Sequence, residues 1–391
     1  MLETVYPEKR LLVYCARAHV EPGMASRIHA LAAGPLDWEY VRREASENAI
    51  LPLVARHLFA AAPDVLPAEH VERMKTAVRA NTVRCLSLTA ELIKIMDRFR
   101  SEGILAIPYK GPVIAAQAYG DVALREYDDL DMILAQRDLP KACEVMLGLG
   151  YQKKFPWILS TDAGASPVPG EYNFRDEAQR VLVELHTELT LRHFPATLDV
   201  DDFQKNLVPV DLSGHEVATF SPQDVLLLLC VHGAKDFWER LSWIADVSEL
   251  VQSHPGLDWD QVLRRAESLK CGRMLNLGLA LAASILDMPL PAELFRRVQN
   301  DHKAGIVASE IERRLLSREW IPPHAAGRFR FRRCMVPGYF AGWRYAMRLA
   351  IAPAEEDWQM VRLPRLLAPL YILLRPFRLV HKYGGIGRRG H

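Results

Sequence analysis

The chain has 391 residues and a formal net charge of +1; half of its residues are hydrophobic and a quarter are charged. This composition is ordinary for a globular protein and excludes a disordered or low-complexity chain, and the length suffices for two or three domains. The six cysteines are scattered and form no CxxC pair, which argues against a disulfide framework or a thiolate zinc site and for a reducing compartment.

The apolar segments are too short to cross a membrane. The first residues show no cleavable signal pattern. The run LLAPLYILL at 366–374 has nine residues, whereas a spanning helix needs about 20. We therefore expect no transmembrane segment and a cytoplasmic location.

The first hundred residues predict helices. The segment 71–103 has apolar residues at three- and four-residue spacing and ends at Gly103, which is typical of a helix with one buried face. We expect an N-terminal helical region over residues 1–103.

After Gly103 the hydrophobic period changes and predicts a small α/β core over residues 104–215. Proline at its start and glycine at its end favour a helix over 112–120, and a run rich in Gly, Pro and Ser indicates a loop over 161–173. The other predicted elements are strands at 104–111, 129–135 and 180–189 and a helix at 139–151. The predicted fold class is α+β, with a small mixed β-sheet flanked by N-terminal and C-terminal helical regions.

Helical patterns return at Ser221, which suits an N-cap before Pro222. We expect a helical domain over residues 216–300, with helical stretches at 222–252 and 259–287. A basic C-terminal region over residues 301–391 follows, with a further helix near 362–382.

The basic C-terminal region makes the charge of the chain uneven. From Arg313 onward sixteen Arg or Lys stand against four acids, so this part carries +12 and the rest about −11. Such an asymmetry has two interpretations. The region binds an anionic partner, or it packs on the acidic body of its own chain.

Three aspartates stand within four positions in the segment REYDDLDMIL (125–134). Alternate side chains of a strand share a face, so Asp129 and Asp131 point the same way, about 7 Å apart along the strand. Asp128 faces the other way and is expected to be exposed or paired with an arginine. Neighbouring carboxylates repel each other in the absence of a cation. The pair is therefore either a solvated acidic turn or a site for Mg²⁺, which prefers oxygen ligands.

The strand RVLVELH (180–186) offers a third carboxylate. Glu184 and His186 share one face, opposite Val183 and Leu185. Glu184 is either a metal-site acid or a surface charge on an edge strand. His186 either contacts a ligand or is a hydrogen-bonded, half-buried histidine.

The helical stretch 222–252 carries polar residues at regular spacing. His232 and Lys235 lie three positions apart, so one helix face can present both. The other residues of the set are Trp238, Arg240, Trp243 and Asp246. We interpret the two tryptophans as buried in a seam between helices, an interpretation that includes an ion pair between the arginine and the aspartate.

As a set, these motifs resemble a known family. The segments YKGPVIAAQAYGD, LREYDDLDMIL and VELH, in this order, are similar to the polymerase-beta-like nucleotidyltransferase superfamily and, more narrowly, to a bacterial family of uncharacterised nucleotidyltransferases. The stretch LLLLCVHGAKDFWERLSWIADVSELV resembles the same family. The resemblance covers about residues 10–255 and, weakly, residues 363–376.

The resemblance implies a metal site. It assigns Asp129 and Asp131 to Mg²⁺ (or Mn²⁺) bound together with a nucleoside triphosphate, and it makes Glu184 a third metal-side carboxylate or the general base. The residues that it implies for nucleotide binding are Lys110, Gly111, Arg125, His186, His232 and Lys235.

The turn at Gly111 departs from the superfamily pattern. The superfamily usually has Gly-Ser here, at a helix N-terminus whose N–H groups can bind the triphosphate. This chain has Gly111-Pro112, and proline lacks an N–H donor. Phosphate binding is therefore expected to depend more on Lys110, Arg125 and Lys235.

The implied activity is the metal-dependent transfer of a nucleoside monophosphate from an NTP to an acceptor, with release of pyrophosphate. The acceptor stays open between a small molecule, a peptide, a protein side chain and RNA. Two other classes remain: a nucleotidyltransferase-like protein that binds nucleotide or a partner without catalysis, and an adaptor that binds a membrane surface or nucleic acid through the basic C-terminal region. No P-loop, HExxH or GxSxG pattern occurs.

Overall fold

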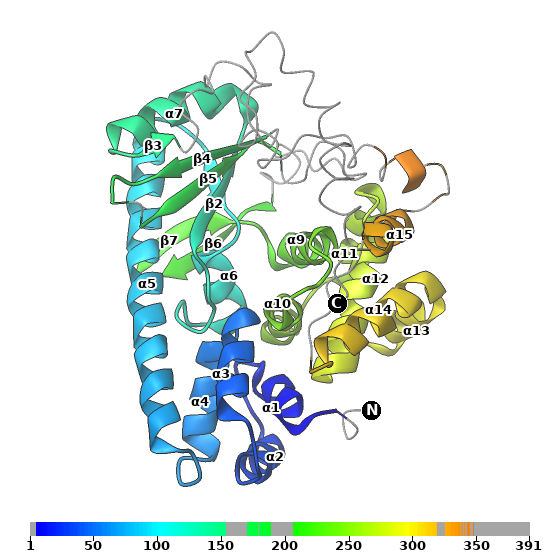
Figure 1. Cartoon of the computed structure of the whole chain (residues 1–391). Helices are drawn as coiled ribbons and strands as arrows, with labels where there is room; N and C mark the ends of the chain where they lie inside the picture. Colours follow the sequence, from blue (N-terminus) through cyan, green and yellow to red (C-terminus); the bar gives the residue numbers. More distant parts are fainter. Residues whose placement is uncertain are drawn as a thin grey trace, which may run out of the picture.

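The computed structural model describes residues 5–153, 170–178, 180–188, 206–318 and 325–336, together with 338, 340, 342–344 and 347. Figure 1 shows a β-sheet at one end of the molecule, a group of N-terminal helices at the other, and further helices beside both. One long helix, α5, connects the N-terminal helices to the sheet. The described chain is thus a mixed α/β protein, as its sequence predicts.

The helices and strands follow one another in blocks. The N-terminal helices are α1 (Pro7–Cys15), α2 (Pro22–Ala32), α3 (Trp38–Glu47), α4 (Leu51–Ala61) and α5 (Ala68–Ser101). The sheet region contains β1 (Ala106–Pro108), α6 (Pro112–Ile114), η2 (Ala115–Tyr119), β2 (Asp129–Leu134), η3 (Gln136–Asp138), α7 (Leu139–Gly148), β3 (Gln152–Lys153), β4 (Glu171–Arg175), β5 (Leu182–His186), β6 (Val208–Leu212) and β7 (His215–Thr219). The later helices are α9 (Pro222–Lys235), α10 (Leu241–Ser253), α11 (Trp259–Ser268), α12 (Gly272–Leu286), α13 (Ala292–Asn300), α14 (His302–Leu315) and α15 (Ala325–Met335).

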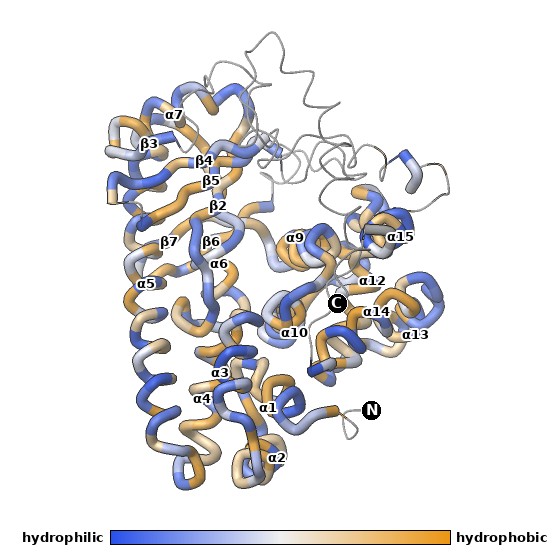
Figure 2. The backbone as a smooth tube through the Cα atoms, viewed as in Figure 1, coloured by the Kyte–Doolittle hydropathy of each residue, from blue (hydrophilic) through white to orange (hydrophobic). Residues whose placement is uncertain are grey.

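Helix α5 has 34 residues, which makes it about 50 Å long at a rise of about 1.5 Å per residue. Figure 2 shows hydrophobic residues recurring along it at intervals of about a turn. Its buried side chains include Leu88, Leu92, Ile95 and Phe99, so one stripe packs inward while the opposite face stays polar. Neither α5 nor any other helix in the described part of the chain is long and apolar enough to cross a membrane.

The main sheet has five strands in the order β1-β2-β5-β4-β3. Strand β2 pairs antiparallel with β1 and parallel with β5, and β4 pairs antiparallel with both β5 and β3. In the parallel pair Asp131 stands opposite Glu184, and Ile133 opposite His186. Two strands that are far apart in the sequence therefore lie side by side, with the same face of each turned the same way.

The two faces of the central strands have different roles. Leu130, Met132, Val183 and Leu185 form one hydrophobic core with α5 and α7. Ile133 faces the other way and belongs to a larger core, which joins α1 and α4 to α9, α10 and α12. Because side chains alternate along a strand, the acidic residues of β2 and β5 share the face that is turned toward the later helices.

The structure corrects several predicted elements. Strand β4 overlaps the predicted loop 161–173, and the hairpin of β6 and β7 has no counterpart among the predicted elements. The helix predicted at 112–120 is a three-residue α-helical turn that continues as a π-helix. The helix predicted near 362–382 and most of the predicted loop lie outside the described residues.

A sharp corner divides the predicted helical stretch 222–252 into α9 and α10. Phe237 and Trp238 both have left-handed backbone angles, with φ of 61° and 51°, which is unusual for bulky residues. The Trp238 N–H donates to the carbonyl of Gly233 at 2.8 Å, and its side chain is fully buried. Tertiary packing of this tryptophan therefore holds the corner.

Helix α15 carries basic residues that contact the same chain. The guanidinium groups of Arg328 and Arg332 each lie 5.1 Å from the ring centroid of Phe237. Arg328 also lies 3.5 Å from Glu239, and Arg330 lies 3.6 Å from Glu310 on α14. For these arginines the structure favours packing on the body of the chain, one of the two interpretations of the basic C-terminal region.

Candidate functional site

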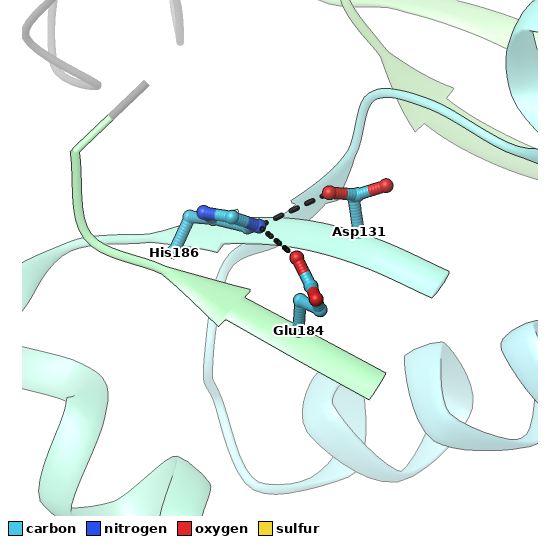
Figure 3. A group of neighbouring side chains, drawn as sticks. All are labelled: Asp131, Glu184 and His186. Atoms are coloured by element: carbon cyan, nitrogen blue, oxygen red, sulfur yellow. Dashed lines mark hydrogen bonds and ion pairs between the residues drawn. The ribbon is translucent and has the colours of Figure 1, made fainter. Parts of the chain in front are cut away.

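Strands β2 and β5 bring three polar side chains together. Figure 3 shows Asp131, Glu184 and His186 pointing toward one another from the two strands. The His186 Nε2 lies 3.1 Å from Asp131 Oδ1 and 3.4 Å from Glu184 Oε2. This cluster follows from the parallel register, because the paired positions 131 and 184 present their side chains on the same face.

Lys110 supplies a second cation to the same carboxylate. Its Nζ lies 2.7 Å from Asp131 Oδ1, and it follows Tyr109, whose backbone N–H donates to the carbonyl of Asp131 at 3.3 Å. The Tyr109 ring stands edge-on to the His186 ring, with centroids 5.6 Å apart. The β1–β2 pairing therefore fixes Lys110 beside the acidic face, as its predicted role in nucleotide binding requires.

Gly111 is needed where it stands. Its φ of 54° lies in the left-handed region, and a Cβ would meet the carbonyl oxygen of Asp129 at 3.3 Å and the Tyr127 ring at 3.6 Å. Glycine lets the backbone pass closely behind β2. The helix that starts at Pro112 has only one α-helical turn before the π-helix, and the phosphate-binding role that the resemblance implies for this turn stays a prediction.

Burial and charge set the protonation of the cluster. Burial opposes ionisation of Asp131, but Lys110 and His186 outweigh it and hold the pKa of Asp131 well below its usual range. Burial lowers the pKa of His186, but its hydrogen bonds to Asp131 and Glu184 more than compensate and raise that pKa to about 9. Burial, then the charges of Asp131 and Glu184, raise the pKa of Asp129 to about 7. At neutral pH His186 is therefore protonated, Asp131 is ionised, and Asp129 is only partly ionised.

The carboxylates of the cluster fit a divalent cation. One ligand atom from each of Asp131, Glu184 and His186 lies within 4.8 Å of the others. Asp131 is only 2% exposed, and its Oδ2 has no hydrogen-bond partner in the described structure. A buried carboxylate oxygen without a partner is costly, and a cation would satisfy it. Asp129 lies outside this close group but on the same strand face, so its assignment as a metal ligand stays a prediction.

Arg125 is fixed by a residue that the sequence interpretation paired differently. Its Nε and Nη2 donate to Asp246 at 3.0 to 3.1 Å, and the Tyr119 hydroxyl donates to Asp246 at 2.9 Å. The predicted pair of Arg240 and Asp246 is therefore wrong; the Arg240 guanidinium instead lies 5.9 Å from the Trp243 ring centroid. Asp246 and Tyr119 were missed as neighbours of the site.

His232 and Lys235 lie at the C-terminal end of α9 and face the same region. The His232 Nδ1 lies 3.3 Å from Asp236 Oδ2, and its ring stands edge-on to Trp243 at 5.2 Å. Burial, then the charges of Lys110 and Lys235, hold the pKa of His232 well below its usual range. A neutral imidazole thus borders the cationic side of the cluster.

Two other predictions in this region are confirmed. Asp128 is exposed and pairs with Arg84 at 2.9 Å, so it takes no part in the cluster. Trp238 is fully buried, as expected for a seam between helices. Trp243 is only half-buried.

One comparison with known proteins identifies the family of the chain. No curated protein matches the chain significantly. A solved structure, described as an antigenic nucleotidyltransferase-like protein from Paracoccidioides brasiliensis, aligns with 15% identity and a TM-score of 0.34, over 54% of this chain and 96% of that one. The family model described as "Uncharacterised nucleotidyltransferase" matches residues 34–287, more than half of the chain and the whole of the site. The chain therefore belongs to this family of uncharacterised nucleotidyltransferases.

Proposed function

We propose that the protein transfers a nucleoside monophosphate from an NTP to an acceptor, with Mg²⁺ or Mn²⁺ as cofactor and pyrophosphate as the leaving product. The observation that carries the proposal is the pairing of Asp131 with Glu184 across parallel strands, with Lys110 at 2.7 Å from Asp131, in a chain of a nucleotidyltransferase family. Carboxylates with a nearby lysine suit the binding of a metal-bound triphosphate.

Asp131 and Glu184 would hold the cation, with Asp129 as a third acidic neighbour. When bound, the cation supplies neutralisation of the charge that develops on the phosphates during transfer. Lys110 binds phosphate oxygens as a point charge, and Arg125 donates hydrogen bonds to them. Gly111 lets the backbone come close to the nucleotide.

The chemistry proposed is an in-line displacement. An acceptor oxygen attacks the α-phosphorus, the bond to the bridging oxygen breaks, and pyrophosphate leaves with the bonding electrons. Glu184, the half-buried carboxylate of β5, would hold the cation through one oxygen and take the acceptor proton on the other. The His186 Nε2 is already engaged, since it lies 3.1 Å from Asp131 Oδ1 and 3.4 Å from Glu184 Oε2. It orients Asp131 and Glu184 through its Nε2.

The test is incubation of the protein with each α-³²P-labelled NTP, with Mg²⁺ or Mn²⁺, in a lysate that supplies acceptors. We expect label to appear on one acceptor class and pyrophosphate to be released. Asp131→Asn and Glu184→Gln should abolish labelling, while the exposed Asp128→Asn serves as the matched control and keeps it. Equal labelling by Glu184→Gln would contradict its role as base.

A second candidate is a protein that binds nucleotide or a partner without catalysis. The observation that favours it is Pro112, which leaves the turn after Gly111 without one N–H donor. NTP binding without pyrophosphate release, with every acceptor and metal, would favour this candidate.

The remaining features of the proposal concern the setting of the reaction. The acceptor is a small molecule, a peptide, a protein or RNA, and the reaction is proposed to take place in the cytoplasm. We also propose that the basic region 301–391 contacts an anionic partner. The proposal leaves out the arginines that pack on Phe237 or pair with Glu310.

A further inference from the structure

Arg125 is held from one side by a completely buried carboxylate. Asp246 is 0% exposed, and both of its oxygens accept from the guanidinium: Oδ1 from Nε at 3.0 Å, and Oδ2 from Nε at 3.1 Å and from Nη2 at 3.0 Å. Oδ1 also accepts from the Tyr119 hydroxyl at 2.9 Å. This fork geometry fixes both the position and the plane of the guanidinium.

The other side of the guanidinium is free. An arginine side chain has five N–H donors, and Asp246 engages only those of Nε and one of Nη2. Nη1 makes no hydrogen bond in the described part of the chain. It is also not one of the buried side-chain atoms that lack a partner there. The side chain keeps 12% of its exposure, so it is not completely sealed from solvent.

Arg125 lies on the chain just before the strand of the acidic cluster. Arg125 precedes β2 by four positions, and its charge lowers the pKa of both Asp129 on β2 and His232 on α9. The anchored guanidinium thus precedes the strand that carries the candidate metal ligands, and it is held from α10. An anion that bridges these two elements would meet its unpaired donors.

We propose that Asp246 and Tyr119 are positioning residues that hold the Arg125 guanidinium with its free edge toward the phosphates of a bound triphosphate. This rests on the proposed function in taking a triphosphate as the ligand. The anchoring removes the rotational freedom that an exposed arginine would lose on binding. It also explains why a helix as apolar as α10 buries an aspartate at this position.

The experiment measures binding to the full-length protein by calorimetry, with inorganic triphosphate, inorganic phosphate and adenosine as separate probes in Mg²⁺. Arg125→Lys should weaken triphosphate binding about tenfold or more, because lysine can pair with Asp246 but has no second pair of donors. Asp246→Asn should weaken it similarly and Tyr119→Phe about threefold, with the loss growing with the number of phosphates. Adenosine binding should not change. Arg84→Lys, in the exposed pair with Asp128, is the matched control.

A structural role alone predicts a different pattern. Titrations at 15 °C, with each melting temperature recorded, separate affinity from stability. If Asp246→Asn does not fold, the triphosphate affinities of Arg125→Lys and Tyr119→Phe distinguish a positioning role from a structural one. Triphosphate affinity equal to wild type in these two variants, or no binding of triphosphate by the wild type, overturns the inference. Triphosphate binding by the wild type without any nucleotide transfer overturns the proposed function and leaves the inference standing.

Discussion

Replacing the two aspartates of β2 one at a time is expected to move stability in opposite directions. Asp131 has two cationic partners, Lys110 at 2.7 Å and His186 at 3.1 Å. Breaking a buried ion pair costs about 3–5 kcal/mol. The Lys110 side chain is still 25% exposed, so solvent replaces part of the interaction. We expect Asp131→Asn to lower the free energy of unfolding by about 2–3 kcal/mol.

The Asp129 carboxyl group has no ion pair or hydrogen bond with any described residue. Its pKa rises from 3.8 to about 7, mainly by burial and then by the charges of Asp131 and Glu184. Because the pKa of this carboxyl group is higher in the folded than in the unfolded protein, the group ionises first in the unfolded chain. The folded protein therefore loses stability as pH rises from about 4 to 7. Roughly 3 pKa units at about 1.4 kcal/mol each give up to about 4 kcal/mol at pH 8. Asp129→Asn should therefore stabilise the metal-free protein at pH 8 and have no effect at pH 4.

Urea unfolding in EDTA at pH 8 measures both changes. Asp128→Asn is the control, since its only partner in the described structure, Arg84, is on the surface, and it should shift stability by less than about 0.5 kcal/mol. A stabilised Asp131→Asn would refute the assignment of Lys110 and His186 as the counter-charges of Asp131. A destabilised Asp129→Asn would refute the raised pKa of Asp129.

Three further predictions concern the helical body. Burial raises the pKa of Glu249 to about 7 from 4.5, so Glu249→Gln should be up to about 3 kcal/mol more stable than wild type at pH 8 and equal to it at pH 4.5 by urea unfolding; an equal difference at both pH values would contradict this. A Cβ on Gly233 would lie 2.6 Å from ring carbons of Trp238, so Gly233→Ala should cost about 1–3 kcal/mol despite its better helix propensity, and an unchanged melting temperature would exclude the contact. Arg332→Ala should lower the free energy of unfolding by about 1 kcal/mol through lost stacking on Phe237. The Arg330 side chain is 65% exposed, so Arg330→Ala should lower it by less than about 0.5 kcal/mol. Equal losses of stability in thermal unfolding would count against intramolecular packing of α15.

The sheet could be predicted where its strands are buried. The segment DLDMIL alternates polar and apolar residues, and it forms β2 as predicted. The hairpin of β6 and β7 was missed although Ser213-Gly214 stands at its turn with φ of 56° and 90°, a known hairpin signal. Pro209 and the polar residues of VPVDL obscured it, since proline counts against a strand.

The corner between α9 and α10 could not be predicted from local sequence. The segment KDFWER contains neither glycine nor proline, and left-handed angles at Phe237 and Trp238 are unfavourable in isolation. They are compensated by the packing of Trp238 against Gly233 and Gly278, where an added Cβ would clash with its ring. Such a contact depends on the complete helical core.

The acidic cluster was predicted from strand alternation, but its wider surroundings were not. A lone aspartate in the apolar stretch LSWIADV signals a buried partner, and Arg240 was assigned to it. Side chains six positions apart do not share a helix face. The true partner, Arg125, lies 121 positions earlier, and only the tertiary structure identifies it.

The order in which contacts can form follows from the pairing of β2 with its two neighbours. Lys110 and Asp131 are 21 positions apart, whereas Asp131 and His186 are 55 apart. Shorter chain loops close at a lower entropic cost, so the antiparallel β1–β2 pair can form before β5 arrives. Glu184 then docks beside an aspartate that already has a counter-charge. During synthesis, a chain that ends before β5 would therefore hold Asp131 paired with Lys110, and the candidate metal site would be complete only after the fifth strand has been added.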